Sequence, residues 1–321
     1  MLPRMETTPE SLSTRSSRPT GTAGRRLRIA APATIAAASL ALVACGGSDP
    51  AKPGSVPTGD IAAIGTGGGA VSKAQFDRFL DAQLSGRSPL GGSIAGAIPL
   101  DPPAFSRCSA ALAANEARNR QPKSSAATLK ASCQAQYRQT RDAVESQLIS
   151  YQWLVQEAAD RGVKTDDAEV RRTLDQYIAA AASANGEKAS QAKSAFDRRL
   201  KQSGLTLDDV KLQLRAQILQ QKMSKEYSES VGEPSSSEAE EFYAKNRSLF
   251  ATAGKPAPPF KQIEEQVKTT LRSQKLQGKQ VEFQNELQRK WKAATLCAKG
   301  YVVAQCSNGP KLPDLVPPKT S

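Results

Sequence analysis

The chain has 321 residues, of which 39% are hydrophobic and only 5% aromatic, and its formal net charge is +13. This composition favours one domain with long polar flanks. The chain contains no histidine, which removes the commonest general base and the commonest metal ligand near neutral pH.

The first predicted element is an export signal. Residues 25–28 carry three arginines and precede an uncharged run, residues 29–44, that is shorter than the ~20 residues needed to span a bilayer. Residues 42–45, Leu-Val-Ala-Cys, are typical of a lipoprotein cleavage site. We therefore predict a signal peptide at 1–44, lipidation of Cys45 and attachment to the outer face of the cell membrane through two acyl signals. A buried alanine-rich helix and a twin-arginine signal are the alternatives.

A flexible tether is predicted next, at residues 45–70. It is mostly Gly, Ser, Pro, Thr and Ala, with almost no large side chains apart from a short apolar run at 61–64. The glycines at 65–69 superficially resemble a phosphate-binding loop, but no Lys-Ser/Thr follows them. A linker is the better interpretation. Without residues 1–44, which hold six arginines and two glutamates, the chain keeps a charge of +9 and favours anionic surfaces.

Helical patterns fill the middle of the chain. Ser72 and Gln75 form a capping box before an apolar stripe, and residues 109–161 have helical periodicity. Gly162 ends that helix, and Thr165 and Asp166 begin the next. Residues 207–223 are apolar on two sides, so that helix needs either two partners or one partner and a bound client.

Further helices are predicted towards the C-terminus. A Ser237/Glu240 box opens a helix that ends around Phe250, and a long helix restarts at Phe260 with Gly278 as a weak point. Residues 297–306 suggest a small disulfide-closed hairpin. The proline-rich residues 308–321 are predicted to be a disordered tail.

Four cysteines remain after Cys45, an even number in a compartment where disulfides persist. Three pairings are possible in principle. Short loops close at low entropic cost, which favours Cys108–Cys133 and Cys297–Cys306. A zinc site is the competing reading, but there is neither a Cys-x-x-Cys motif nor a histidine. We therefore expect no metal and no cofactor.

Several of these helix-boundary motifs resemble one family. They are Val-Ser-Lys-Ala-Gln-Phe at 71–76, Leu-Ile-Ser-Tyr-Gln-Trp at 148–153, Gly-Val-Lys-Thr-Asp-Asp at 162–167 and Ser-Gly-Leu-Thr-Leu-Asp-Asp at 203–209. Together they resemble the N-terminal domain of SurA/PrsA-type extracytoplasmic foldases. Residues 241–250 resemble that family's exit helix, and residues 290–301 resemble the C-terminal end of actinobacterial lipoprotein members.

The resemblance implies a mainly helical fold: a SurA N-terminal-like domain at 71–250, completed by a C-terminal helix and hairpin at 258–307. It also implies that a parvulin-type prolyl isomerase domain of ~100 residues would follow Phe250, whereas only a loop separates Phe250 from Phe260. Parvulin sites use a pair of histidines, which this chain lacks. No catalytic residue is therefore assigned, and no enzyme is expected.

The function expected from this combination is a membrane-tethered chaperone that binds unfolded or newly secreted polypeptides without chemistry. Its physical basis would be surplus apolar surface on the helices. For Trp153, Met223 and Trp291 core packing is favoured over client contact, so the client-binding residues stay unknown. A structural or adaptor lipoprotein with one specific partner is the alternative. Nucleic acid is not an expected partner outside the membrane.

An unrelated hydrolase is the remaining alternative. The chain has no Gly-x-Ser-x-Gly elbow and no metal-ligand spacing. Its acidic cluster, Glu238, Glu240 and Glu241, lies in the first turn of a predicted helix, where the helix dipole accounts for it.

Overall fold

The computed structural model describes residues 50, 52–65, 69–88, 98–252 and 255–316. The chain divides into two units, Met1–Gly46 and Gly47–Ser321, and every described residue lies in the second. The predicted signal peptide and Cys45 lie outside the described residues, so lipid attachment stays a prediction. Within the described part, no helix combines the length and the apolarity needed to cross a bilayer.

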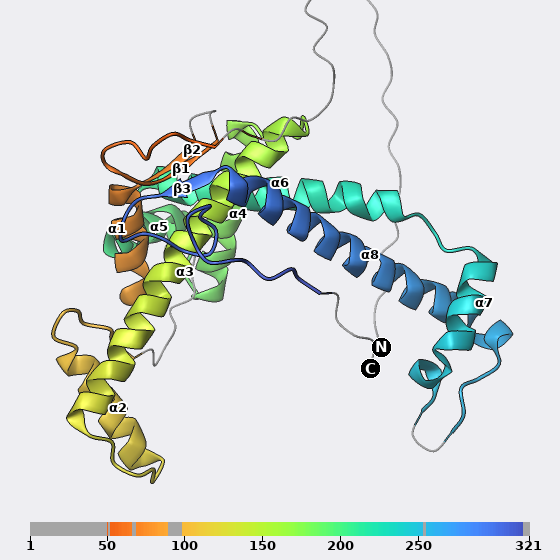
Figure 1. The fold of residues 1–321 in the computed structure, drawn as a ribbon, viewed down its shortest axis with the longest axis horizontal. Coiled ribbons are helices and arrows are strands. Elements are labelled where there is room, and N and C mark those ends of the chain that lie inside the picture. The colour runs from red at the N-terminus through yellow and green to blue at the C-terminus, as the bar shows by residue number, and fades with distance from the viewer. Residues whose placement is uncertain (1–49, 51, 66–68, 89–97, 253–254, 317–321) are drawn as a thin grey trace, which may run out of the picture. The chain divides into compact units, whose positions relative to one another are not determined.

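The described residues are mainly helical, as predicted, with one small sheet (Figure 1). In chain order the elements are β1 (Asp60–Ile64), β2 (Gly69–Ser72), α1 (Lys73–Leu84), α2 (Ser106–Arg118), α3 (Ala126–Asp160), α4 (Asp167–Ala184), η1 (Ala189–Gln191), α5 (Ala192–Ser203), α6 (Leu207–Val231), α7 (Ser236–Lys245), η2 (Arg247–Phe250), α8 (Phe260–Ala293) and β3 (Thr295–Cys297).

The prediction of a tether up to residue 70 is wrong for its last part. The apolar run at 61–64 belongs to β1, the central strand of a sheet with the order β2-β1-β3, and both pairings are antiparallel. Ile61 and Ile64 are 1% and 0% exposed in the main core. Such a short strand is marginal in an isolated pair of strands, and here β1 is stabilised by a partner on each edge. One of these partners, β3, comes from the far end of the chain.

The predicted C-terminal hairpin is instead one strand and a loop. β3 pairs with β1, with Cys297 opposite Ala62, and no second strand follows it among the described residues. A disulfide to Cys306 closes the loop across a Cα separation of 5.6 Å. The side-chain amide of Asn308 donates to the Cys297 carbonyl at 3.0 Å and accepts from its N–H at 3.3 Å. This amide takes the place that a partner strand would have.

The stretch 109–161, expected to be helical throughout, is two helices. α2 and α3 are separated by residues 119–125, and Ser125 caps α3 by accepting from the Thr128 N–H. The disulfide Cys108–Cys133, with a Cα separation of 6.1 Å, joins the two helices. Its small core of Phe105 and the two cysteines is separate from the main core.

The main core lies where α1, α3, α6, α8 and the sheet meet. Its largest buried side chains come from all of these elements: Ile61, Phe76, Leu148, Ile149, Trp153, Leu219, Met223, Phe283, Leu287 and Trp291. A second core joins α4, α5 and α6 through Val170, Phe196 and Leu214, and a third joins α7 to the first turns of α8. Each fully buried large apolar side chain stabilises the fold by about 1.5–3 kcal/mol relative to exposure.

Three boundary predictions shift. The capping box of α7 is Ser235 with Glu238, two residues before the predicted one. α8 continues through Gly278, and its non-helical backbone is at Ile263 instead. The tail prediction is wrong for residues 308–316. They lack regular structure, but they are fastened to α8 through the side chain of Asn285, which pairs with the backbone of Leu315 at 2.8 and 2.9 Å.

Candidate polypeptide-binding groove

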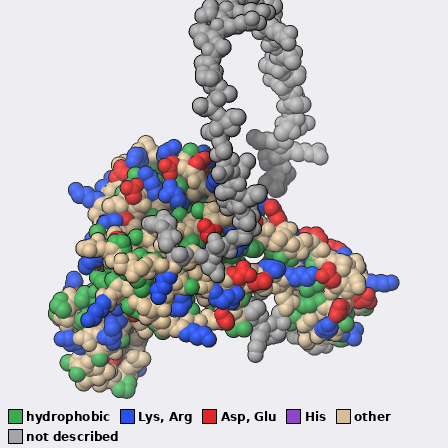
Figure 2. Space-filling model, turned by 45° about the horizontal axis from the view of Figure 1, so that its top comes forward, with side chains coloured by type: hydrophobic (Ala, Val, Ile, Leu, Met, Phe, Trp, Pro, Cys, Tyr) green, Lys and Arg blue, Asp and Glu red, His purple; other side chains and the backbone are tan. Residues whose placement is uncertain are grey.

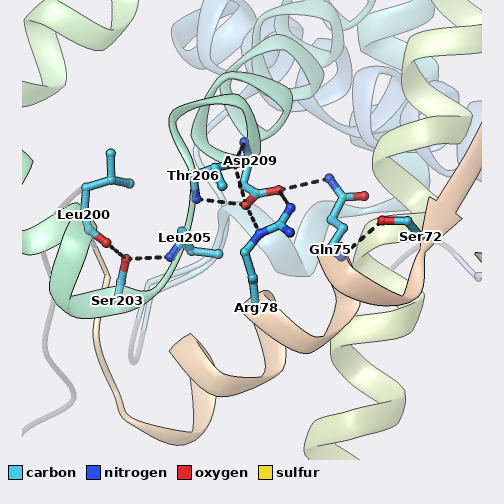
Figure 3. A network of polar contacts seen from close by, with 8 residues as sticks. All are labelled: Ser72, Gln75, Arg78, Leu200, Ser203, Leu205, Thr206 and Asp209. Carbon is cyan, nitrogen blue, oxygen red and sulfur yellow. Dashed lines mark hydrogen bonds and ion pairs between the residues drawn. The ribbon is translucent and has the colours of Figure 1, made fainter. Parts of the chain in front are cut away.

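A buried carboxylate fixes α1 against the start of α6 (Figure 3). Asp209 is 1% exposed and binds the guanidinium of Arg78 through two bonds of 2.7 and 2.8 Å. It also completes the capping box with Thr206 and accepts from the Gln75 amide at 3.2 Å. Burial alone would raise the pKa of Asp209, but the bonds from Arg78 and Thr206 outweigh it and lower the pKa. Because every oxygen is paired, this group is structural.

A second buried carboxylate joins α3 to α8. Glu157 is 3% exposed and accepts at 2.8 Å from both the Lys290 ammonium and the Trp291 indole N–H. Arg161, one turn along α3, binds its other oxygen. Burial would raise the pKa of Glu157, but these hydrogen bonds prevail and lower it. The network fixes the C-terminal half of α8 beside α3, where the two helices border a groove.

That groove consists of three adjoining hollows of about 730, 250 and 400 Å³. The first two share Gln147 and Ser150, and the last two share Gln288 and Leu312. We call the whole feature the α3–α8 groove. Its walls are residues 139–154 of α3, residues 284–293 of α8 and the C-terminal residues 305–314.

Primary amides recur along the whole lining of the α3–α8 groove. Seven glutamines line it: Gln83, Gln139, Gln147, Gln220, Gln284, Gln288 and Gln305. Apolar side chains accompany them in the middle hollow: Tyr151, Trp153, Leu154, Leu287 and Leu312. A primary amide carries both donors and an acceptor, so it can pair with a peptide group whatever side chain that residue has. An apolar lining with amide groups therefore suits extended polypeptide of varied sequence.

The chain itself shows this pairing next to the groove. Along α8, Asn285 donates to the Leu315 carbonyl at 2.9 Å and accepts from the Leu315 N–H at 2.8 Å. Leu312 packs against the main core, and the Lys292 ammonium donates to the Pro310 carbonyl at 2.8 Å. Residues 310–315, which lack regular secondary structure, are thus held along one wall mainly through backbone atoms.

Charge is confined to one end of the α3–α8 groove. The hollows beside α3 are lined by uncharged side chains, whereas the 400 Å³ hollow has three basic residues and one acidic residue: Arg289, Lys292, Lys311 and Asp314. On the face that Figure 2 shows, basic and acidic side chains are interspersed, with hydrophobic ones between them. This end would favour segments that carry negative charge.

The residues singled out from the sequence lie in the core. Trp153, Met223 and Trp291 are 2%, 0% and 2% exposed, and the Trp153 indole N–H donates to the buried Thr295 hydroxyl at 2.8 Å. Of the three, Trp153 also borders the groove. Glu238 belongs to the cap of α7 and pairs with Lys275.

The expected surplus of apolar helix surface is not present in the described residues. Both apolar sides of α6 have partners: Leu214 faces the α4–α5 core and Leu219 the main core. The large hydrophobic residues that remain exposed are few, namely Leu207, Val302, Leu315 and Val316. The lining of the α3–α8 groove is instead a mixture of amide and apolar side chains. The sequence pattern that could have pointed to the groove is the spacing of its glutamines. Gln284 and Gln288 are four residues apart and therefore lie on one helix face.

Comparison with known proteins agrees with the fold. Residues 105–224, which include α3, α4, α5 and most of α6, match the family model of the SurA-like N-terminal domain. No curated protein matches the chain significantly. The same holds for solved structures. In that family this domain is the non-catalytic, chaperone-like part. Residues 105–224 of this chain therefore form a SurA-like N-terminal domain, a domain of folding-related proteins.

Proposed function

We propose that this protein binds unfolded or newly secreted polypeptides without catalysis, on the outer face of the cell membrane, where lipid on Cys45 anchors it. The SurA-like domain supports the chaperone class. The sequence before Cys45 supports export and anchoring. The observation that carries the proposal is the α3–α8 groove, because its lining of amides around apolar side chains matches what all unfolded chains have in common.

Binding in this groove uses the client's backbone. Each amide-to-backbone pair contributes only about 0.5–1.5 kcal/mol net, because the client exchanges bonds to water for bonds to protein. Apolar client side chains on Tyr151, Leu154 and Leu287 add a hydrophobic contribution. Such a site holds many sequences weakly and releases them, as a chaperone requires.

The test is suppression of the aggregation of an unrelated unfolded protein by the purified full chain at near-stoichiometric ratio. The double variant Gln147→Ala/Gln288→Ala removes amides shared between adjoining hollows. The matched control, Gln176→Ala/Gln221→Ala, removes glutamines that line a separate hollow of about 320 Å³ between α4 and α6.

We expect suppression by the wild-type chain and by the control, and at least a threefold loss in the double variant. An equal loss of suppression in both double variants would show that polypeptides do not bind in the α3–α8 groove. A well-folded wild-type chain that suppresses no aggregation would sink the chaperone proposal and favour an adaptor with one folded partner.

A further inference from the structure

Glu145 is a third buried carboxyl group, and its surroundings differ from those of Asp209 and Glu157. It lies on α3 at 0% exposure, and neither of its oxygens has a hydrogen-bond partner among the described residues. A carboxylate oxygen of Glu145 and the sulfur atoms of Cys297 and Cys306 lie within 4.8 Å of one another. A buried polar group without a partner is rare and calls for an explanation.

Burial keeps this carboxyl group in its neutral form. Desolvation raises the pKa of Glu145 from 4.5 to about 8, while Arg141 lowers it and Asp142 raises it by smaller amounts. At neutral pH the group is therefore a carboxylic acid with a proton to give.

Other elements near the disulfide loop also carry titratable groups, namely Lys73 on α1, Lys292 on α8 and Lys299 and Tyr301 in the loop. Of these, Lys73 is paired with Asp77 and Lys292 is held by the carbonyl groups of Ala304, Cys306 and Pro310.

We propose that Glu145 and the Cys297–Cys306 disulfide form a redox site, in which Glu145 is the acid that protonates the leaving sulfur when a dithiol reduces the bond. The substrate class is a dithiol, either a small molecule or a protein with two thiols. This activity is separate from polypeptide binding.

The reaction balances in two exchanges. A thiolate of the reductant attacks the sulfur of Cys297, because that residue is 4% exposed whereas Cys306 is 0% exposed. The Cys297–Cys306 bond breaks, its electron pair goes to the Cys306 sulfur, and Glu145 gives that sulfur its proton. The second reductant thiol passes its proton to the Glu145 carboxylate and then attacks the mixed disulfide. Cys297 leaves as a thiolate and takes up that proton, while the reductant becomes a disulfide.

Among the described residues, no carboxyl oxygen lies within 4.8 Å of both sulfur atoms of Cys108–Cys133. The Asp101 carboxylate accepts from the Cys108 N–H at 2.9 Å, but its backbone hydrogen bonds lower its pKa, so it has no proton to give at neutral pH. The Ser109 hydroxyl lies 4.0 Å from the Cys133 sulfur, and a serine hydroxyl is a far weaker acid than a carboxyl group. The two disulfides therefore form an internal comparison within one molecule. The rate of thiol–disulfide exchange depends on how well the leaving sulfur is stabilised. A neighbouring acid should therefore speed the reduction of Cys297–Cys306 and not that of Cys108–Cys133.

Reduction would also change the α3–α8 groove, a consequence that rests on the proposed function. The disulfide closes the loop that carries Gln305, which lines the groove and accepts from the Ser146 hydroxyl at 2.9 Å. Opening the bond frees this loop and the adjoining Leu312 from one covalent constraint. The redox state of the site would thus set how firmly one wall of the groove is held.

The test measures reduction of each disulfide in the purified full chain by dithiothreitol between pH 6 and pH 9.5. Acid quenching, alkylation and peptide mass spectrometry report the two pairs separately, and rate constants are divided by the thiolate concentration. Glu145→Gln removes the acid with little change in shape. Glu282→Gln, which alters an exposed pair with Lys279 on α8, is the control.

We expect the rate constant for Cys297–Cys306 at pH 7 to fall at least tenfold in Glu145→Gln, in line with the ~100-fold or larger effects of general acids. The wild-type value should fall towards that of the variant above pH 8, while Cys108–Cys133 and the control stay unchanged. An unaltered rate in Glu145→Gln would overturn the proposal. So would a rate that follows global unfolding measured by circular dichroism. Neither result depends on polypeptide binding, which the aggregation assay tests by itself.

Discussion

Helix α3 carries two glutamates, Glu157 and Glu145, that are buried almost equally, at 3% and 0% exposure. Glu157 has three donors around it and a lowered pKa. Glu145 has no hydrogen-bond partner in the described part of the chain and a raised pKa. Burial alone therefore does not decide the protonation state of a buried acid. The hydrogen-bond donors around it do, because a carboxylate with donors stays ionised whereas one without them is kept as a neutral acid.

The largest expected effect is the removal of the paired acid. Glu157→Leu leaves the buried Trp291 indole N–H without its acceptor, while the Lys290 ammonium keeps Asp160 as a partner at 2.8 Å. Leaving a buried donor unpaired costs about 1–3 kcal/mol, and the lost ion pairs bring the total towards the ~3–5 kcal/mol of a broken buried pair. Glu145→Leu leaves no donor unpaired and should cost far less at pH 7. Urea unfolding of both variants measures the difference. Equal losses would contradict the contrast between the two sites.

The second effect is the opposite pH dependence of the two sites. Because the pKa of Glu145 is raised to about 8, the unfolded chain releases this proton above pH 4.5 while the folded chain keeps it. The stability contributed by this group is thus complete below about pH 4.5 and is lost as pH rises to about 8. The loss amounts to roughly 1.4 kcal/mol per pKa unit. The unfolding free energy of Glu145→Gln should therefore rise relative to that of the wild type between pH 5 and pH 8.

The stability contributed by Glu157 should depend on pH in the opposite direction. Its pKa is lowered, so its stabilisation is present above the ordinary carboxyl pKa and is lost as pH falls through the folded value. The deficit of Glu157→Gln relative to the wild type should thus shrink in acid. Unfolding free energies from pH 3 to pH 9 test both slopes, and parallel curves for the two variants would rule out the assigned pKa directions.

The third comparison separates the two disulfides. Chain entropy predicts a loss of about 3.5 kcal/mol for Cys108→Ala/Cys133→Ala and about 2.6 kcal/mol for Cys297→Ala/Cys306→Ala, because the first bridge closes the longer loop (separations of 25 and 9 residues). Only the second double variant should change the pH dependence, since only its cysteines lie beside Glu145. Thermal unfolding at pH 5 and pH 8 decides this.

The smallest effect concerns the C-terminal segment. Asn285→Ala removes two bonds to Leu315 at a half-exposed site and should change stability by no more than about 1 kcal/mol. If residues 310–315 compete with clients for the α3–α8 groove, the variant should bind an unfolded fluorescent peptide more tightly, by about twofold. Unchanged or weaker binding would show that the segment completes the groove instead of competing for it.

Features that depend on residues close together along the chain could be predicted from the amino-acid sequence. Helix starts at Ser72, Asp166 and Thr206 follow from a side chain that accepts from the N–H three residues later. The two disulfides are the local pairings that loop entropy favours. The family resemblance rested on such boundary patterns, which explains why the fold class and residues 105–224 were predictable.

The remaining features depend on contacts between segments that are far apart in the sequence. β1 resembles a tether in sequence because its pairing with β3 spans more than 230 residues, and no local pattern records that contact. The glutamines of the groove come from α1, α3, α6, α8 and the C-terminal loop, so their convergence depends on packing. Glu145 is one ordinary glutamate in a helical sequence. Its side chain stays protonated at neutral pH because a loop about 150 residues further along the chain covers it with sulfur atoms and excludes water.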